Sequence, residues 1–366
     1  MSRAQVLAFR AHAQQLTRSR DAVPAHELAI TELGVLDVPT PAAATAIALR
    51  GGDPDDELVL VWGVRGAPAL HRRADLGFLT AAMWPLSDTD ATRRINNPRI
   101  TEGTRGGLAA LAETARAVHA VLSERTGRFN TSELSQGVTT RIRDALSYDC
   151  LPCGARHVAG SVLQNAGLAG GAELLRDGRS TEFRLLPGVE VPERATGTDE
   201  LVRRYLRLLG PATPADVATY LGTSTAELNP VWPDDVSEVS VEGRTGWQLN
   251  GDVDALLSAP PLDLVRLLPP GDPWLQARDR DLVLPEKVRR SAVWKAIAAP
   301  GILLVDGEIT GTWRARTTGT TTRRADVSVT GFEELAPRVV AALAAEIPFI
   351  ATGRGVEEAR LSVEDG

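Results

Sequence analysis

Apolar residues recur at helical spacing in the first third of the chain. In residues 3–19 they fall on one side of a helix, at Val6, Leu7, Phe9, Ala13 and Leu16. Further helices are predicted at 73–87 and 106–125, and the apolar run at 56–64 predicts a short buried strand. The stretch from Gly34 to Pro41 interrupts a helical pattern that would otherwise cover 25–50. Residues 1–130 are therefore predicted to form an N-terminal domain, mainly helical or itself a winged helix.

A repeated order of elements follows in the middle of the chain: helix, turn, helix, then β-strands around a glycine. The first copy has helices at 131–146 and 154–168 and a strand at 180–188. The second has helices within 198–232, where Thr213 is suited to cap the second helix, and a β-hairpin at 236–251. Two helices joined by a turn and followed by a hairpin are typical of a winged helix. We therefore expect winged-helix domains at 131–192 and 197–258.

The pattern changes after about Pro260. Residues 301–332 alternate apolar and polar side chains with glycines at the turns, which predicts a small β-sheet or barrel, and residues 332–350 predict a final helix. The fourth predicted domain covers 260–366. The predicted fold class is α+β, with tandem winged-helix domains and a C-terminal small β-barrel.

The composition fits several small cores without disulfide support. A chain of 366 residues, 43% of them hydrophobic, exceeds the usual size of one domain. Its two cysteines, Cys150 and Cys153, are too few for a disulfide framework, which favours a reducing compartment. No stretch reaches the roughly twenty apolar residues that a bilayer requires, and the N-terminus has no cleavage-site pattern. We expect a soluble, cytoplasmic protein that does not contact a membrane.

The charge pattern is compatible with a nucleic-acid partner although the net charge is −7. Basic surface drives phosphate binding, so the negative balance argues against such a partner at first. Of the 40 basic residues, however, only Lys287 and Lys295 are lysine, and arginine binds phosphates and base edges bidentately. Acidic residues concentrate elsewhere, at 53–57 and 234–235. A surface divided into acidic and basic regions is therefore expected.

Four segments resemble a known family. They are ELGVLDVP (32–39), VWGVRGAPALHRRADL (61–76), DPWLQARDR (272–280) and LLVDGEITGTWR (303–314). Together they are similar to the winged-helix DNA glycosylases of the AlkZ-like or YcaQ-like type, over nearly the whole chain. The resemblance implies tandem winged helices around a concave channel for double-stranded DNA, a C-terminal β-barrel and a hairpin that approaches the minor groove.

The family's catalytic signature is Gln-x-Gln or Gln-x-Asp, and the resemblance places it near Pro39. Asp37 matches the second position, whereas Val35 stands where the family has its glutamine. A cationic alkylated purine is already a good leaving group, so a single carboxylate can stabilise the oxocarbenium-like sugar and orient water. Asp37 is therefore the catalytic candidate. The alternative is an aspartate that caps the turn before Pro39.

Two groups of basic residues are candidates for DNA contacts. The first is Arg65, His71, Arg72 and Arg73, which are suited to hold phosphates near a lesion, and His71 alternatively to position the sugar. The second is Arg314, Arg316, Arg323 and Arg324, which flank the threonine-rich turn 317–322 of a predicted hairpin that suits a minor groove. The alternatives are a solvated loop for the first group and a hairpin with charged edges that prevent aggregation for the second.

The cysteines raise the question of a metal. Cys150 and Cys153 are separated by two residues, and His157 follows four residues later. A structural zinc site requires four ligands and the chain has no other cysteine, so we interpret the pair as part-buried thiols and expect neither metal nor cofactor.

Two functions of different classes remain open. The first is a monofunctional DNA glycosylase that hydrolyses the N-glycosidic bond of bulky or cationic N-alkylated purines. The second is a catalytically silent winged-helix DNA-binding protein or transcriptional regulator that has lost the glutamine. Regulators usually add a dimerisation or ligand domain, which the pattern does not contain, so we expect a monomer. No motif of a serine hydrolase, a zinc protease or a phosphate-binding loop occurs.

Overall fold

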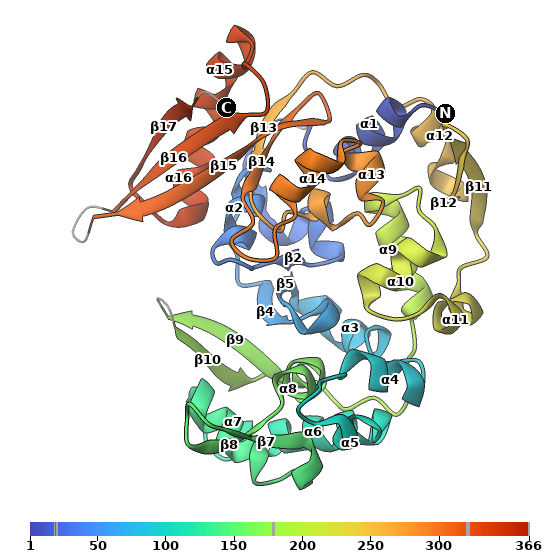
Figure 1. Ribbon diagram of the computed structural model, residues 1–366, viewed down its shortest axis with the longest axis vertical. Helices are drawn as coiled ribbons and strands as arrows, with labels where there is room; N and C mark the ends of the chain where they lie inside the picture. The colour runs from blue at the N-terminus through green and yellow to red at the C-terminus, as the bar shows by residue number, and fades with distance from the viewer. Residues whose placement is uncertain (18, 20, 178–179, 320–322, 365–366) are drawn as a thin grey trace. The chain divides into compact units, whose positions relative to one another are not determined.

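The computed structural model describes residues 1–17, 19, 21–177, 180–319 and 323–364. It has a mixed α+β fold whose contacts divide the chain into two compact units. Unit 1 comprises Met1–Asp56, Arg203–Asp216 and Asp234–Gly366, and unit 2 comprises Glu57–Val202 and Val217–Pro233. Figure 1 follows the chain from end to end. None of the helices in the described ranges is long and apolar enough to cross a membrane.

Unit 2 is built on a sheet with helices packed together beside it. Helix α6 contacts both α7 and α8, and Leu111, Val118 and Val162 are fully buried in the core that the helices share with the sheet. Within this unit the strand order is β5–β4–β9–β10–β6. The elements are β4 (Leu58–Trp62), β5 (Pro68–Arg72), α3 (Leu76–Ala82), α4 (Asp88–Arg94), α5 (Thr101–Thr104), α6 (Gly107–Leu122), β6 (Phe129–Asn130), α7 (Thr131–Thr139), β7 (Ser147–Cys150), β8 (Ala155–Val158), α8 (Gly160–Gly167), β9 (Ala172–Asp177) and β10 (Ser180–Leu185).

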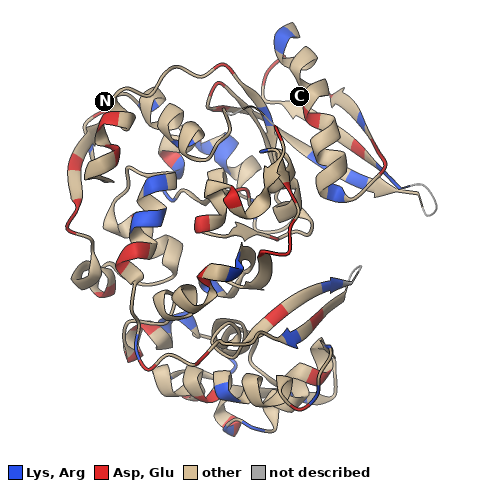
Figure 2. Cartoon of the chain, turned by 180° about the vertical axis from the view of Figure 1, so that it is seen from behind, with Lys and Arg blue, Asp and Glu red and all other residues tan. Residues whose placement is uncertain are grey.

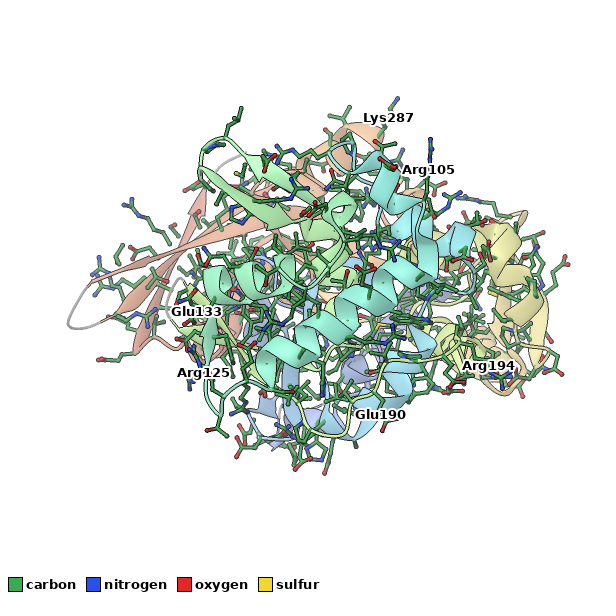
Figure 3. All side chains as sticks on the ribbon, turned by 90° about the horizontal axis from the view of Figure 1, so that it is seen from below. Arg105, Arg125, Glu133, Glu190, Arg194 and Lys287 are labelled. Carbon is green, nitrogen blue, oxygen red and sulfur yellow. The ribbon has the colours of Figure 1, made fainter. Side chains whose placement is uncertain are left out.

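The N-terminus of α7 is fixed by reciprocal capping. The Asn130 side chain accepts from the Glu133 N–H at 2.9 Å, and the Glu133 carboxylate accepts from the Asn130 N–H at 2.8 Å. Arg125 also donates to Glu133 at 2.8 Å, and Figure 3 labels both residues. These hydrogen bonds, that of Arg125 above all, hold the pKa of Glu133 below its usual value. The predicted start of a helix at residue 131 is confirmed.

The helix predicted at 73–87 is divided in the structure. Helix α3 ends at Ala82 and α4 begins at Asp88, because Pro85 lies between them and the Ser87 side chain caps α4 by accepting from the Asp90 N–H at 3.1 Å. The first helix is also shorter than predicted, since α1 covers Arg3–Ala13.

The second repeated pattern is confirmed in the order of its elements. They are α9 (Thr198–Leu209), α10 (Pro214–Leu221), α11 (Thr225–Leu228), β11 (Val236–Val241) and β12 (Arg244–Leu249). Thr213 caps α10 as expected, because its hydroxyl accepts from the Asp216 N–H at 3.2 Å. Strands β11 and β12 pair antiparallel, and an isolated bridge joins Ala212 to Trp247.

The C-terminal part of unit 1 is a five-stranded sheet that curls into half a barrel (Figure 1). Its strand order is β13–β14–β15–β16–β17, so β13 and β17 form open edges instead of closing a barrel. One face buries Leu267, Leu303 and Val327 against two helices. The elements are β13 (Val265–Leu268), β14 (Gly301–Val305), β15 (Glu308–Thr318), β16 (Arg324–Gly331), α15 (Pro337–Leu343), α16 (Ile347–Arg354) and β17 (Glu358–Glu364). Strand β17 was not predicted; it pairs parallel with β16.

Candidate functional site

The segment around Asp37 precedes helix α2 (Ala42–Ala48) in unit 1. Asp37 is buried, at 6% exposed, and both of its carboxylate oxygens accept hydrogen bonds. The Thr40 hydroxyl donates to Oδ2 at 2.8 Å, and the Ala43 N–H donates to Oδ1 at 3.3 Å. The carboxylate therefore satisfies a donor in the first turn of α2, as the capping alternative expects. Val35, at the position of the family's glutamine, is completely buried in strand β2 (Val35–Leu36).

A second loop of unit 1 packs directly on this segment. Gly271 has a φ of +77°, and a Cβ there would lie 3.0 Å from the Val38 carbonyl oxygen. Glycine is required both by the left-handed backbone and by the close approach. The next residue, Asp272, forms a bidentate ion pair with Arg50 at 2.9 and 3.0 Å, and both side chains are 0% exposed.

The buried ion pair joins the loop to the end of α2. Arg50 also donates to the carbonyl oxygens of Ala46 at 3.0 Å and Gln14 at 2.9 Å, so its guanidinium is held by backbone as well as by the carboxylate. Asp272 in turn accepts from the Trp274 N–H at 3.0 Å. This network fixes the loop at 269–272 against the helix that Asp37 caps.

A pocket of about 230 Å³ opens where these segments meet the C-terminal sheet of unit 1. Residues 39–42, 45, 269–270, 298–301, 313–315 and 354 line it. Five of them are prolines, and the Trp313 ring is held in place by donating to the Leu268 carbonyl oxygen at 2.8 Å. Arg314 thus lines the same pocket as Pro39 and Thr40, whereas Asp37 itself is not among the lining residues.

Arg354 lines the same pocket and was not among the candidates. Its Nη2 donates to the Thr317 hydroxyl at 3.0 Å, while its buried Nε has no hydrogen-bond partner among the described residues. Burial and the charge of Arg323 lower the pKa of Arg354. Its position in α16 gave no sequence signal, because helix packing alone brings it beside the hairpin.

Three of the four predicted arginines, Arg314, Arg316 and Arg324, lie on one face of the hairpin of β15 and β16, as its register requires. Arg314 and Arg316 are exposed on β15, Arg323 is exposed just before β16, and Arg324 forms an ion pair with Asp326 at 3.3 Å. Figure 2 shows basic residues on these strands. Antiparallel pairing places Arg316 opposite Asp326. Residues 320–322 of the threonine-rich turn lie outside the described residues.

The other basic group lies in unit 2. Arg65 and Arg73 are exposed and Arg72 is partly exposed, whereas His71 is 1% exposed in β5. Alternation along the strand turns neighbouring side chains to opposite faces, which explains why Arg72 remains accessible when His71 does not. A phosphate cannot reach the His71 ring in this conformation. Asp37 and the hairpin arginines belong to unit 1, whereas Arg65, His71, Arg72 and Arg73 belong to unit 2.

Comparison with known proteins gives one family and one solved structure. The model of the family described as DNA glycosylase AlkZ-like matches residues 32–351. The solved structure of a Streptomyces sahachiroi DNA glycosylase AlkZ is similar with a TM-score of 0.75 and 22% sequence identity, over 100% of both chains. At that identity the structural likeness establishes the fold. No curated protein matches the chain.

Proposed function

Because the chain belongs to the AlkZ-like DNA glycosylase family, we propose that it hydrolyses the N-glycosidic bond of bulky or cationic N-alkylated purines in double-stranded DNA. The observation that carries the proposal is the pocket in unit 1, whose lining includes residues 39–42, which follow Asp37 in the chain, and Arg314 of the basic hairpin. Proline and tryptophan walls suit an extruded, planar base, and arginines beside them suit its flanking phosphate. No metal or cofactor is needed for this hydrolysis.

In the proposed mechanism Asp37 orients water and offsets positive charge on the sugar. The Thr40 hydroxyl and the Ala43 N–H donate to different oxygens of the carboxylate. These same bonds hold the carboxylate in one orientation, which favours a charge aimed at the transition state. The positively charged base leaves without an acid, so one carboxylate suffices.

We also propose that two winged helices hold the duplex. The order α6, β6, α7, β7, β8, α8, β9, β10, with β6 paired to β10, supports one of them. The order α9, α10, α11, β11, β12 supports the other. We propose the domain boundaries that the sequence predicts, at 1–130, 131–192, 197–258 and 260–366.

A pocket-blocking substitution tests this assignment. Ala299 lines the pocket and is partly exposed, so tryptophan in its place should fill the space without disturbing the core. We expect Ala299→Trp to bind alkylated duplex as the unmodified protein does but to release less free base. Lys295→Trp, exposed four residues earlier and outside the lining, is the matched control. Full excision by Ala299→Trp would remove the pocket from the mechanism.

The hairpin arginines should contribute mainly salt-dependent affinity. Arg316 and Arg323 are exposed and have no carboxylate partner among the described residues. Changing both to alanine should flatten the plot of log K against log salt by about two phosphate contacts, a slope change of roughly 1.8, whatever the DNA sequence.

The control for the hairpin variant removes the same charge elsewhere in unit 1. Arg289 and Arg338 are paired with carboxylates, at 2.6 Å to Glu333 and 2.6 Å to Asp306 respectively. Their double alanine variant should leave the slope nearly unchanged. If both double variants behave alike, the hairpin has no special role in DNA binding.

A catalytically silent DNA-binding protein is the second candidate. It is favoured by the local geometry of Asp37, whose two oxygens already accept from Thr40 and from the first turn of α2, and by Val35 in the place of the glutamine. In that case the pocket and hairpin bind DNA without excision.

A further inference from the structure

The hairpin of β7 and β8 in unit 2 brings together three side chains that ligate metals. Cys150 ends β7, Cys153 lies in the turn, and His157 is on β8 opposite Tyr148. One ligand atom of each lies within 4.8 Å of those of the other two. In a tetrahedral zinc site ligand atoms are about 3.5–4 Å apart, as bond lengths of about 2.3 Å to sulfur and about 2.0 Å to nitrogen require. Small side-chain rotations would therefore close the three around one ion.

The backbone of the turn places the two sulfurs side by side. The N–H groups of Cys153 and Gly154 both donate to the Cys150 carbonyl oxygen, at 3.2 and 2.9 Å. Gly154 has a φ of +62°, which an L side chain rarely adopts. A tight turn between cysteines two residues apart is the spacing found in zinc-binding hairpins.

The surroundings of the His157 ring suit a metal ligand. Its Nδ1 lies 3.5 Å from the Ser135 hydroxyl on α7, whereas its Nε2 is buried and has no hydrogen-bond partner among the described residues. A metal-bound histidine uses one ring nitrogen for the ion and the other for a hydrogen bond that orients the ring. A bound cation would satisfy the nitrogen that otherwise lacks a partner.

We propose that Cys150, Cys153 and His157 bind a zinc ion that has an open fourth position for water. A structural zinc site usually has four protein ligands, but three ligands and a water also form a stable zinc coordination. Binding replaces the two thiol protons, which are released to solvent. The ion would link the β7–β8 hairpin through His157 and Ser135 to α7. The proposal stands independently of any glycosylase activity.

The test uses the full, tag-free chain purified under reducing conditions and freed of metal by a chelator. Titration with Zn²⁺ should give one ion bound per chain, and Co²⁺ should give the charge-transfer absorption of thiolate ligands. Cys153 is exposed, so Cys153→Ser should keep the fold, yet lose the absorption and the rise in melting temperature caused by zinc. His119→Ala, which changes an exposed histidine on α6, is the control that should keep both.

Two results would overturn the proposal. One is that the reduced chain binds no zinc at stoichiometric concentration. This result counts against the proposal even if the two cysteines form a disulfide in air. The other is a cobalt spectrum that Cys153→Ser and His157→Ala leave unchanged. Circular dichroism of each variant confirms that it is folded, so loss of binding can be assigned to the ligands.

Discussion

Changing Asp37 to asparagine should keep the fold and the DNA affinity but lower base excision by a factor of about a hundred to a thousand, the range for one preorganised electrostatic group. The oxygen of the introduced amide can still accept from the Ala43 N–H, and its NH₂ group can donate to the Thr40 hydroxyl, so the turn remains capped. Only the negative charge is lost. Single-turnover release of free base, with enzyme in excess, measures the effect on chemistry.

Thr40→Val separates capping from catalysis. It removes the hydrogen bond to Oδ2 and retains the Asp37 charge, so it should lower stability slightly and keep most of the excision. If Asp37→Asn excises as well as the unmodified protein, Asp37 serves only as a cap.

Changing Asp272 to alanine should destabilise the protein by about 3–5 kcal/mol, because it leaves the Arg50 charge buried without its carboxylate. Both side chains are 0% exposed, and Asp272 also caps the turn at Trp274. The free energy of unfolding from urea denaturation measures the loss. The same loop lines the pocket, so excision should fall at temperatures where the variant is partly unfolded.

Two further variants test whether the burial of the ion pair causes the large loss of stability in Asp272→Ala. Asp281 pairs with Arg244 at the surface of unit 1, where both side chains are about half exposed, so Asp281→Ala should cost no more than about 1 kcal/mol. The double variant Arg50→Met and Asp272→Leu should be less destabilised than Asp272→Ala, since it buries no unpaired charge. Equal losses for Asp272→Ala and Asp281→Ala would contradict this account.

The sequence predicted elements better than it predicted their boundaries and partners. The order of helices and hairpin at 198–249 follows from local periodicity and caps, and it is confirmed. Pro85 divided the helix at 73–87, a local effect that the apolar spacing concealed. Strand β17 escaped prediction because its pairing with β16 joins residues more than thirty positions apart.

The candidate site was predictable to a similar extent. Resemblance to the family located Asp37, and charge clustering located the hairpin arginines. Arg354 could not be found in this way, because it reaches the pocket only when α16 packs on the sheet. The burial of His71 follows from alternation in β5, which a count of nearby basic residues does not reveal.

The most direct test of the central claim is base release from defined duplexes. The unmodified protein is incubated in excess with DNA that carries one N7-methylguanine or one bulky N7-alkylguanine, and free base and alkali-labile abasic sites are measured. We predict release from at least one of these duplexes, none from undamaged DNA, and a greatly reduced rate with Asp37→Asn. Tight binding of both alkylated duplexes with no free base from either would contradict the account and establish the silent DNA-binding function.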